Sequence, residues 1–400
     1  MSPVPIPGAR PCPHSGRTLL YHACPAPGES AAGVHALVIG ISRYDRRRRG
    51  GAQVMANLPG AATVAARFAR FVAGELRDPT GVPVRTVRLL TSLMPDQTVP
   101  DSDEASLERV QYALDDWTED CNRHPDNVAV LYIAGHGVAT ARDARWAFLS
   151  PAGATESPYT FALNLTAIKE SLAFCRARSN VFVWDVCALR GEQIPVYRTG
   201  NVGLTAPDLD ERDRPGAVDQ VTIMARMGTR TYSGYGREHT ILSRALIGLD
   251  AGEARNRLLH TAGELLPGGM FAVTARRLGE LLLPAMRRLN PALADGEEPV
   301  VDPRDSAAGI NRPEPPPEFP VELRWDHEPG EAPLGVTITG TSGGAPIEQT
   351  IGSSLSLGLP AGRYRVTSVR RTGDGLERSS YDLHVDRERR INALDGADVP

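Results

Sequence analysis

The chain has 400 residues, of which 41% are hydrophobic and 23% are charged, and its net charge at pH 7 is -4. This composition is that of a globular protein with at least two domains, and it excludes a disordered or fibrous chain. The negative charge also argues against a nucleic-acid partner, because a duplex binder concentrates basic residues on one face to displace counterions from the phosphates.

The five cysteines are widely spaced and include no CxxC pair, a pattern that favours neither a disulfide framework nor a structural zinc site. No stretch reaches ~18 consecutive apolar residues, the length that crosses a bilayer, and the first residues lack the apolar core of a signal peptide. We therefore expect a cytoplasmic protein that needs no metal or other cofactor and does not bind a membrane.

Residues 1–33 are rich in proline, glycine and small residues, and we expect a loosely ordered arm there. Four apolar runs follow from Val34 onwards. Runs so rich in valine, isoleucine, leucine and aromatic residues suit strands that are buried on both faces of a largely parallel sheet. The runs are HALVIGI (35–41), VRTVRLLT (84–91), NVAVLYIA (127–134) and NVFVWDV (180–186).

Segments with apolar residues three and four positions apart separate these strands, which is the spacing of helices that pack one face on a sheet. The alternation predicts βαβ units and hence an α/β fold, a three-layer sandwich with helices on both faces of the sheet. A fifth strand is expected at 220–226. The helices are expected at 58–76, 106–121, 165–177, about 239–250 and 273–289.

After Leu293, closely spaced prolines indicate an extended linker without regular helix or sheet pairing. Short alternating runs with glycine-rich turns then predict a small antiparallel, immunoglobulin-like β-sandwich. The expected organisation is an arm (1–33), an α/β domain (34–294), a linker (295–318) and an accessory β domain (319–400).

Two candidate catalytic residues follow neighbouring predicted strands. His136 comes directly after 127–134, between two glycines, and Cys187 comes directly after 180–186. The carboxyl ends of parallel strands share one edge of a sheet, so we expect the imidazole and the thiol to meet there. A thiol of pKa ~8.5 needs a neighbouring base to supply thiolate, and His136 is such a base. Taken singly, each residue also fits a structural role.

The succession of HALVIGISRY, LPGAATVAARFARF, VLYIAGHGV and VFVWDVCALRG resembles the caspase and metacaspase clan of cysteine peptidases, over roughly residues 34–290. In that clan a His-Gly dipeptide ends the third strand and the nucleophilic cysteine ends the fourth, which matches His136-Gly137 and Cys187. The resemblance implies a caspase-like fold and a thiol protease, a hydrolase that cleaves peptide bonds with a His136–Cys187 dyad.

The same resemblance implies that the backbone N–H groups of Gly137 and Cys187 form an oxyanion hole for the tetrahedral intermediate. It also implies a protein or peptide substrate and, for bacterial relatives, a part in regulated defence or cell death. Calcium activates some metacaspases, but the sequence reveals no acidic cluster for such a site.

Asp185 stands two residues before Cys187, on the same side of the predicted strand. In the metacaspase branch an Asp at this position lines the pocket for an Arg or Lys side chain, so the resemblance implies cleavage after a basic residue. A carboxylate that faces a guanidinium gains a charge-assisted, bidentate hydrogen bond. The alternative is that Asp185 is a structural carboxyl, capped or ion-paired inside the fold.

Metacaspases usually supply a second acidic residue to this pocket from an Asn-Asp pair in the first helix. Thr63 and Val64 stand at the matching positions here, which departs from the family pattern. Either the pocket holds a single carboxylate or the second comes from elsewhere, for instance from Glu238 or Asp45.

A segment of about thirty residues, 190–219, joins the fourth and fifth predicted strands and has no apolar period. In the clan this connection is the activation linker, which is cut during maturation. The alternative is a surface loop that is never cut. Candidate self-cleavage sites are Arg190, Arg198, Arg212 and Arg214.

Two other functions are compatible with the same residues. One is a catalytically silent caspase-like scaffold or adaptor, and the other is a peptidase of the same clan that does not prefer basic residues. The C-terminal domain carries no nucleophile, acid pair or metal-spaced cluster in its sequence. We therefore expect it to bind a partner, such as a protein activator.

Overall fold

The computed structural model forms two compact units. The α/β unit comprises Met1–Ala262 and Thr274–Asn311, and the β unit comprises Gly263–Val273 and Arg312–Pro400. The described residues are 20–23, 31–44, 56–139, 145–149, 162–186, 219–225, 239–248, 257–267, 269–291, 293, 299–303, 309–325, 334–341, 345–372, 375–393 and 395–398.

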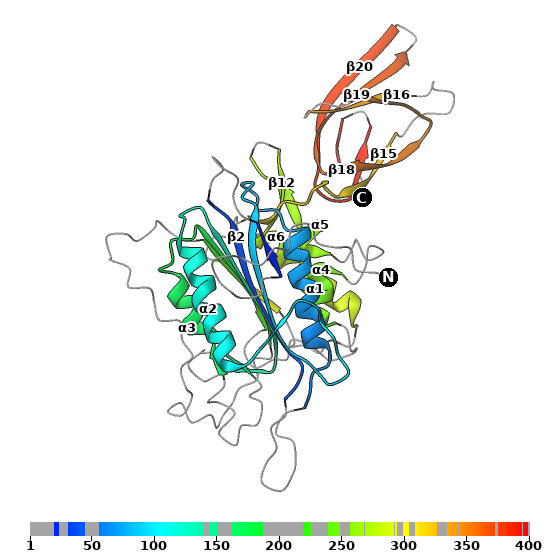
Figure 1. Ribbon diagram of the computed structural model, residues 1–400. Coiled ribbons are helices and arrows are strands. Elements are labelled where there is room, and N and C mark those ends of the chain that lie inside the picture. The colour runs from blue at the N-terminus through cyan, green and yellow to red at the C-terminus, as the bar shows by residue number, and fades with distance from the viewer. Residues whose placement is uncertain are drawn as a thin grey trace. The chain divides into compact units, whose positions relative to one another are not determined.

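An eight-stranded sheet forms the centre of the α/β unit (Figure 1). Its order is β1-β3-β2-β5-β9-β10-β13, with β4 beside β3. All pairs are parallel except the outer ones, β1 with β3 and β10 with β13. The strands are β1 (Tyr21–His22), β2 (Val34–Ile41), β3 (Val84–Ser92), β4 (Asp103–Glu104), β5 (Val128–Gly135), β9 (Ser179–Val186), β10 (Asp219–Ala225) and β13 (Pro299–Pro303).

Helices cover both faces of this sheet, as the sequence predicts (Figure 1). Phe68 of α1 stacks on Tyr132 of β5 on one face, with 4.3 Å between the ring centroids. On the other face Trp117 of α2 donates its indole N–H to the carbonyl oxygen of His35, at 2.9 Å. One face carries α1 (Gly60–Gly74), α4 (Ile241–Ile247), α5 (Leu258–Thr261) and α6 (Ala275–Leu289), and the other carries α2 (Leu107–Asn122) and α3 (Leu165–Leu172).

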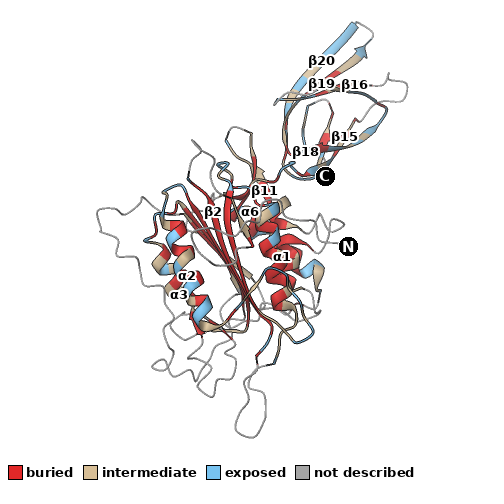
Figure 2. Ribbon diagram, viewed as in Figure 1, coloured by how far each residue is buried: buried red, intermediate tan, exposed pale blue. Residues whose placement is uncertain are grey.

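The four apolar runs in the sequence correspond to β2, β3, β5 and β9, with ends that differ by at most one residue. Every residue of β2, β5 and β9 is buried. Figure 2 shows this burial along the central sheet, with exposed residues on the outer sides of the helices. The prediction of a largely parallel sheet with helices on both faces is confirmed. Strands buried on both faces have no solvent-facing side, which is why their sequences are continuously apolar.

A small antiparallel sheet follows β5 directly, and the sequence did not predict it. It consists of three short strands with few β-branched residues. They are β6 (Gly137–Ala139), β7 (Arg145–Phe148) and β8 (Ala162–Asn164).

Two segments that were expected to lack regular pairing supply the edge strands of the large sheet. Within the expected arm, Tyr21 and His22 pair with β3. Within the expected linker, residues 299–303 form β13 and pair with β10. The prediction that prolines prevent pairing in 295–318 is wrong, because Pro299 and Pro303 stand at the ends of an edge strand. A missing N–H costs least at such positions.

The next short strand, β14 (Gly309–Asn311), also belongs to the α/β unit. The Asn311 side chain is fully buried. It donates to the carbonyl oxygen of Leu259 at 2.6 Å and accepts from the backbone N–H of Arg77 at 2.8 Å. The expected linker therefore contributes buried polar contacts to the α/β unit.

The β unit contains two sheets whose inner side chains form one apolar core, which includes Leu323, Trp325 and Val366. The strand pairs are antiparallel except for β15 with β21, which are parallel. This parallel pair corrects the expected all-antiparallel sandwich: the chain crosses from one sheet to the other after β20. The two sheets have the strand orders β18-β15-β21 and β17-β16-β19-β20. Outside these two sheets, β11 pairs with β12 in an antiparallel hairpin.

Strands β15 and β16 of the β unit alternate buried with less buried residues, as half-buried strands do, whereas β12 is buried throughout. The strands of the β unit have the following bounds. They are β11 (Gly263–Leu265), β12 (Phe271–Thr274), β15 (Glu318–Arg324), β16 (Leu334–Gly340), β17 (Ile347–Ile351), β18 (Ser354–Pro360), β19 (Gly362–Thr372), β20 (Gly375–Val385) and β21 (Arg389–Asn392).

Because β13 and β14 lie in 299–311, the stability of a chain truncated at its C-terminal side depends on whether the cut falls before or after them. A chain that ends after Arg312 keeps β13 and the Asn311 hydrogen bonds, whereas a chain that ends after Asp295 loses both. We expect the shorter chain to be less stable by at least about 2 kcal/mol, since each lost buried hydrogen bond costs about 1 kcal/mol. Urea unfolding of the two chains measures the difference, and equal midpoints would contradict this assignment of β13 and β14.

Candidate active site

The candidate site lies at the carboxyl edge of the large sheet, where β2 and β5 adjoin. The chain passes from β2 outwards to β3 and then returns to β5, β9 and β10 on the other side of β2. The strand order therefore reverses between β2 and β5. In open parallel sheets, ligands bind beyond the carboxyl ends of the strands at such a switch point. His136 is the first residue after β5 at this point.

His136 is held by Tyr44, which follows β2. The Tyr44 hydroxyl oxygen accepts a hydrogen bond from the backbone N–H of His136 at 2.7 Å. The two rings also touch, with centroids 4.7 Å apart and planes tilted by 58°. Tyr44 is fully buried, and a Cβ on Gly135 would come within 2.7 Å of its hydroxyl oxygen. Only glycine before His136 permits this approach.

The His136 ring is oriented by a second contact, between its Nε2 and the carbonyl oxygen of Ala56 at 2.8 Å. The segment that carries Ala56 is fixed against the end of β2. Asn57 accepts from the backbone N–H of Tyr44 at 2.8 Å, and Leu58 donates its N–H to the carbonyl oxygen of Ser42 at 2.7 Å.

This contact decides which ring nitrogen of His136 is basic. A carbonyl oxygen can only accept, so Nε2 carries the hydrogen and Nδ1 carries the lone pair. Burial lowers the pKa of His136 below its usual value, and the hydrogen bond to Ala56 opposes that effect. The imidazole is therefore neutral near pH 7 and can accept a proton at Nδ1.

Cys187 lies outside the described residues, and β9 ends one residue before it. Val186, the residue before Cys187, is buried and pairs with Gly135, the residue before His136. The register aligns the ends of β5 and β9. Gly137 begins β6, and its predicted oxyanion-hole role stays a prediction. Other predicted residues that lie outside the described ranges are Asp45, Glu238, Arg190, Arg198, Arg212 and Arg214.

The two described cysteines, Cys121 and Cys175, are free and buried. Burial raises the pKa of each thiol above its usual value. Both side chains belong to the apolar core that α2 and α3 form with the sheet. They are small core residues and poor nucleophiles.

Asp185, the penultimate residue of β9, has no solvent exposure. Its Oδ2 accepts from the hydroxyl of Tyr132 at 2.9 Å and from the hydroxyl of Thr240 at 2.5 Å. Its Oδ1 has no hydrogen-bond partner among the described residues. Burial raises the pKa of Asp185 to about 6, although the hydrogen bonds from Thr240 and Tyr132 lower it.

The partners of Asp185 and His136 were not found in the sequence. Thr240 precedes an apolar run and accepts from the N–H of Ser243, so its role as the N-cap of α4 has a local signal. Its contact with Asp185 has none, because 55 residues separate them. Nothing local links Tyr44 or Ala56 to His136 either. Of the positions compared with the metacaspase pair, Thr63 is half-buried and Val64 is buried in α1.

No family model matches the chain, and no curated protein sequence matches it. The chemistry of the site therefore rests on the geometry of its own residues. Within the described ranges, no cluster of three or more His, Cys, Asp or Glu side chains could hold a metal ion. Nor does any helix in those ranges combine the length and apolar character that crossing a bilayer requires.

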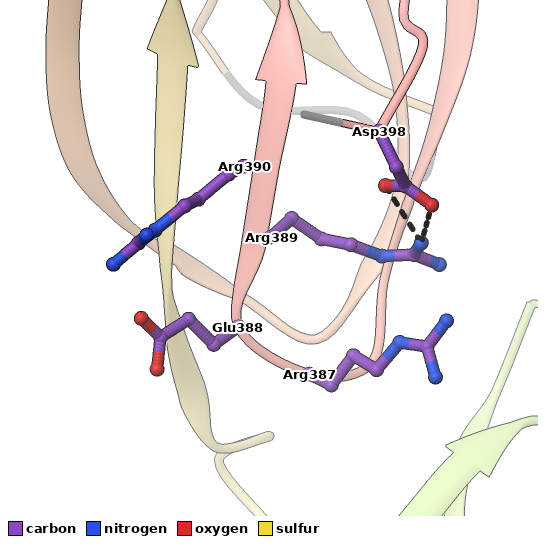
Figure 3. A pocket seen from close by; sticks show the side chains of 5 residues that line it. All are labelled: Arg387, Glu388, Arg389, Arg390 and Asp398. Atoms are coloured by element: carbon purple, nitrogen blue, oxygen red, sulfur yellow. Dashed lines mark hydrogen bonds and ion pairs between the residues drawn. The ribbon is translucent and has the colours of Figure 1, made fainter. Parts of the chain in front are cut away.

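A pocket of about 350 Å³ in the β unit is lined by arginines, but its charges are largely balanced (Figure 3). Arg389 pairs with Asp398 at 3.2 Å, and Arg390 pairs with Glu322 at 3.4 Å. The lining includes no nucleophile. Its residues are Arg387, Glu388, Arg389, Arg390 and Asp398. This pocket is a weaker candidate for chemistry than the edge of the large sheet.

The raised pKa of Asp185 predicts that this carboxylate reduces stability at neutral pH. A shift from 3.8 to about 6 corresponds to about 3 kcal/mol that is present when the carboxyl is protonated and lost as the pH rises through 6. Asp185→Asn should therefore raise the free energy of unfolding at pH 8, by up to about 3 kcal/mol, and by progressively less towards pH 4. Urea unfolding across this pH range provides the measurement. If Asp185→Asn instead lowers the free energy of unfolding at pH 8, other groups stabilise the ionised carboxylate and the prediction is wrong.

Proposed function

We propose that this protein is a cysteine endopeptidase with a caspase-like fold, in which His136 and Cys187 form the catalytic dyad. The observation that carries the proposal is the aligned register of β5 and β9, which ends with Gly135 opposite Val186, one residue before each member of the dyad. The neutral His136 ring, with Nε2 bonded to Ala56 and Nδ1 available, supplies the base that a thiol requires.

In this proposal Nδ1 of His136 takes the proton of the Cys187 thiol as sulfur attacks the scissile carbonyl carbon. The resulting oxyanion accepts hydrogen bonds from the backbone N–H groups of Gly137 and Cys187. The protonated imidazole then gives its proton to the leaving amine, and a thioester remains on Cys187. His136 next takes a proton from water as the water oxygen attacks the thioester, and then gives that proton to the leaving sulfur, which releases the carboxylic acid product and restores the thiol.

Asp185 is the proposed acceptor for a basic side chain of the substrate. Its support is a fully buried carboxyl, two residues before the proposed nucleophile, whose Oδ1 has no hydrogen-bond partner among the described residues. The part of the chain that the structure describes gives this carboxylate no counter-charge, and a lysine or arginine side chain would supply one. Cleavage after basic residues, self-cleavage at the arginines of 190–219 and an immunoglobulin-like β unit that binds an activator belong to the same proposal.

Exchanging either member of the dyad tests the mechanism. We expect Cys187→Ala and His136→Ala each to reduce the hydrolysis of a fluorogenic peptide library by roughly a thousandfold or more, because residues that act as a unit lose most of the activity singly. The controls are Cys175→Ala and His124→Ala, in which a cysteine and a histidine away from this edge are replaced. If neither the wild-type chain nor a variant hydrolyses any member of the library, the protein is a silent scaffold instead.

Tyr44 is expected to act by positioning His136. Tyr44→Phe keeps the ring contact but removes the acceptor of the His136 N–H. We expect kcat to fall about tenfold, with little change in KM, since a loss of orientation affects the transition state more than substrate binding. Tyr112→Phe, at a half-exposed position on α2, is the control. A rise in KM alone would indicate that Tyr44 contacts the substrate.

A further inference from the structure

The two oxygens of the Asp185 carboxyl have unequal surroundings. Oδ2 accepts two hydrogen bonds, one from Tyr132 and one from Thr240, whereas Oδ1 accepts none from the described residues. A carboxylate oxygen offers about two lone-pair sites. Oδ2 is therefore occupied, and Oδ1 is the oxygen that remains able to accept.

Both donors to Oδ2 are held in place by their own packing. The Tyr132 ring is buried and stacks on Phe68 of α1, with planes inclined by only 20°. The Thr240 hydroxyl is the N-cap of α4 and accepts from the N–H of Ser243 at 3.0 Å. Because strand β5 and helix α4 hold these two hydroxyls, the carboxyl group cannot rotate freely to expose Oδ2.

Among the described residues, Oδ1 also lacks a charged partner. No lysine or arginine of the described ranges forms an ion pair with Asp185 within those ranges, and no hydrogen-bond donor there reaches Oδ1. A buried acceptor without a donor costs free energy, about 1–3 kcal/mol, unless something occupies it. A cationic side chain would relieve that cost.

We propose that Tyr132 and Thr240 determine specificity by leaving Asp185 a single open oxygen, which takes the ammonium group of a lysine side chain in preference to the planar guanidinium of arginine. This inference rests on the proposed peptidase site at Asp185. It also differs from the sequence-based expectation of a bidentate hydrogen bond, because a guanidinium fork needs two acceptor oxygens side by side.

The preference follows from the shapes of the two cations. An arginine that meets one oxygen makes one of its two parallel hydrogen bonds and leaves a second buried N–H without an acceptor. A lysine ammonium is a compact charge whose three donors are not tied to a plane, so one acceptor satisfies its main contact. Removing one of the hydroxyl donors to Oδ2 would leave that oxygen able to accept a second hydrogen bond from a guanidinium, and should therefore favour arginine.

Binding of N-acetyl-lysine amide and N-acetyl-arginine amide to the full chain, measured by NMR titration, tests this inference without hydrolysis. We expect the wild-type chain to bind the lysine amide about fivefold or more tightly than the arginine amide. Tyr132→Phe should shift the ratio of the two Kd values about tenfold towards arginine, because one hydrogen bond is worth about that factor. Asp185→Asn should bind neither amide.

Thr240→Val removes the second donor and should shift the ratio in the same direction, but it also removes the N-cap of α4. Thr240→Ser keeps both the hydroxyl and the cap and should restore the lysine preference. Thr222→Val is the matched control, since Thr222 is a buried threonine on β10 whose hydroxyl makes no hydrogen bond within the described residues.

The inference is overturned if the wild-type chain prefers the arginine amide, if neither amide binds, or if Tyr132→Phe and Thr240→Val leave the ratio unchanged. These outcomes are distinct from failure of the proposed function, which appears as peptide hydrolysis that is absent or independent of His136 and Cys187. Selective amide binding without hydrolysis would support the cation site and reject the peptidase. Hydrolysis without selective amide binding would do the reverse.

Discussion

The pairing of β5 with β9 is the constraint on which the site depends. The two strands are parallel and in register from Val128 opposite Ser179 to Gly135 opposite Val186. Every residue in both is buried, so a slip of one residue would turn buried side chains to the opposite face of the sheet. Helices on both faces therefore fix the register, and the register fixes which residues end the two strands side by side.

The same burial determines the charge state of the side chains near this edge. It lowers the pKa of His136, which keeps the ring neutral, and it raises the pKa of Asp185 to about 6. A neutral imidazole can accept a proton, and a buried carboxylate oxygen that no described donor reaches can accept a hydrogen bond from a cation. The shifted pKa values of His136 and Asp185 show that burial disfavours the charged form of each group. Side chains with shifted pKa values cluster at functional sites. The site combines tightly packed strands with one buried carboxyl oxygen, Oδ1 of Asp185, that has no partner within the described ranges.

The buried strands and their helices could be predicted from the sequence because their apolar patterns are local and continuous. The edge strands could not. β1 contains only two residues and β13 is bounded by prolines, so neither carries a strand signal that outweighs its composition. Residues 299–303 become an edge strand by pairing with β10, and this pairing depends on the folded sheet rather than on the local sequence.

The residues that end the strands could be predicted, whereas their partners could not. His136 and Asp185 stand at recognisable positions of apolar runs. The hydroxyls of Tyr44 and Thr240 reach them across 92 and 55 residues of sequence. Such contacts can be seen only in the folded chain. They orient the neutral His136 ring and place the hydroxyl donors of Tyr132 and Thr240 on the same oxygen of Asp185.

The most direct test of the account is the rate at which iodoacetamide alkylates Cys187 at pH 7, measured by mass spectrometry in the wild-type chain, His136→Ala and His124→Ala. The account predicts that Cys187 in the wild type and in His124→Ala reacts at least about tenfold faster than in His136→Ala, because the neighbouring imidazole increases the fraction of thiolate. It also predicts that Cys121 and Cys175 react slowly throughout, since both are buried. Equal rates at Cys187 in the wild type and in His136→Ala would contradict a functional pair at this edge of the sheet.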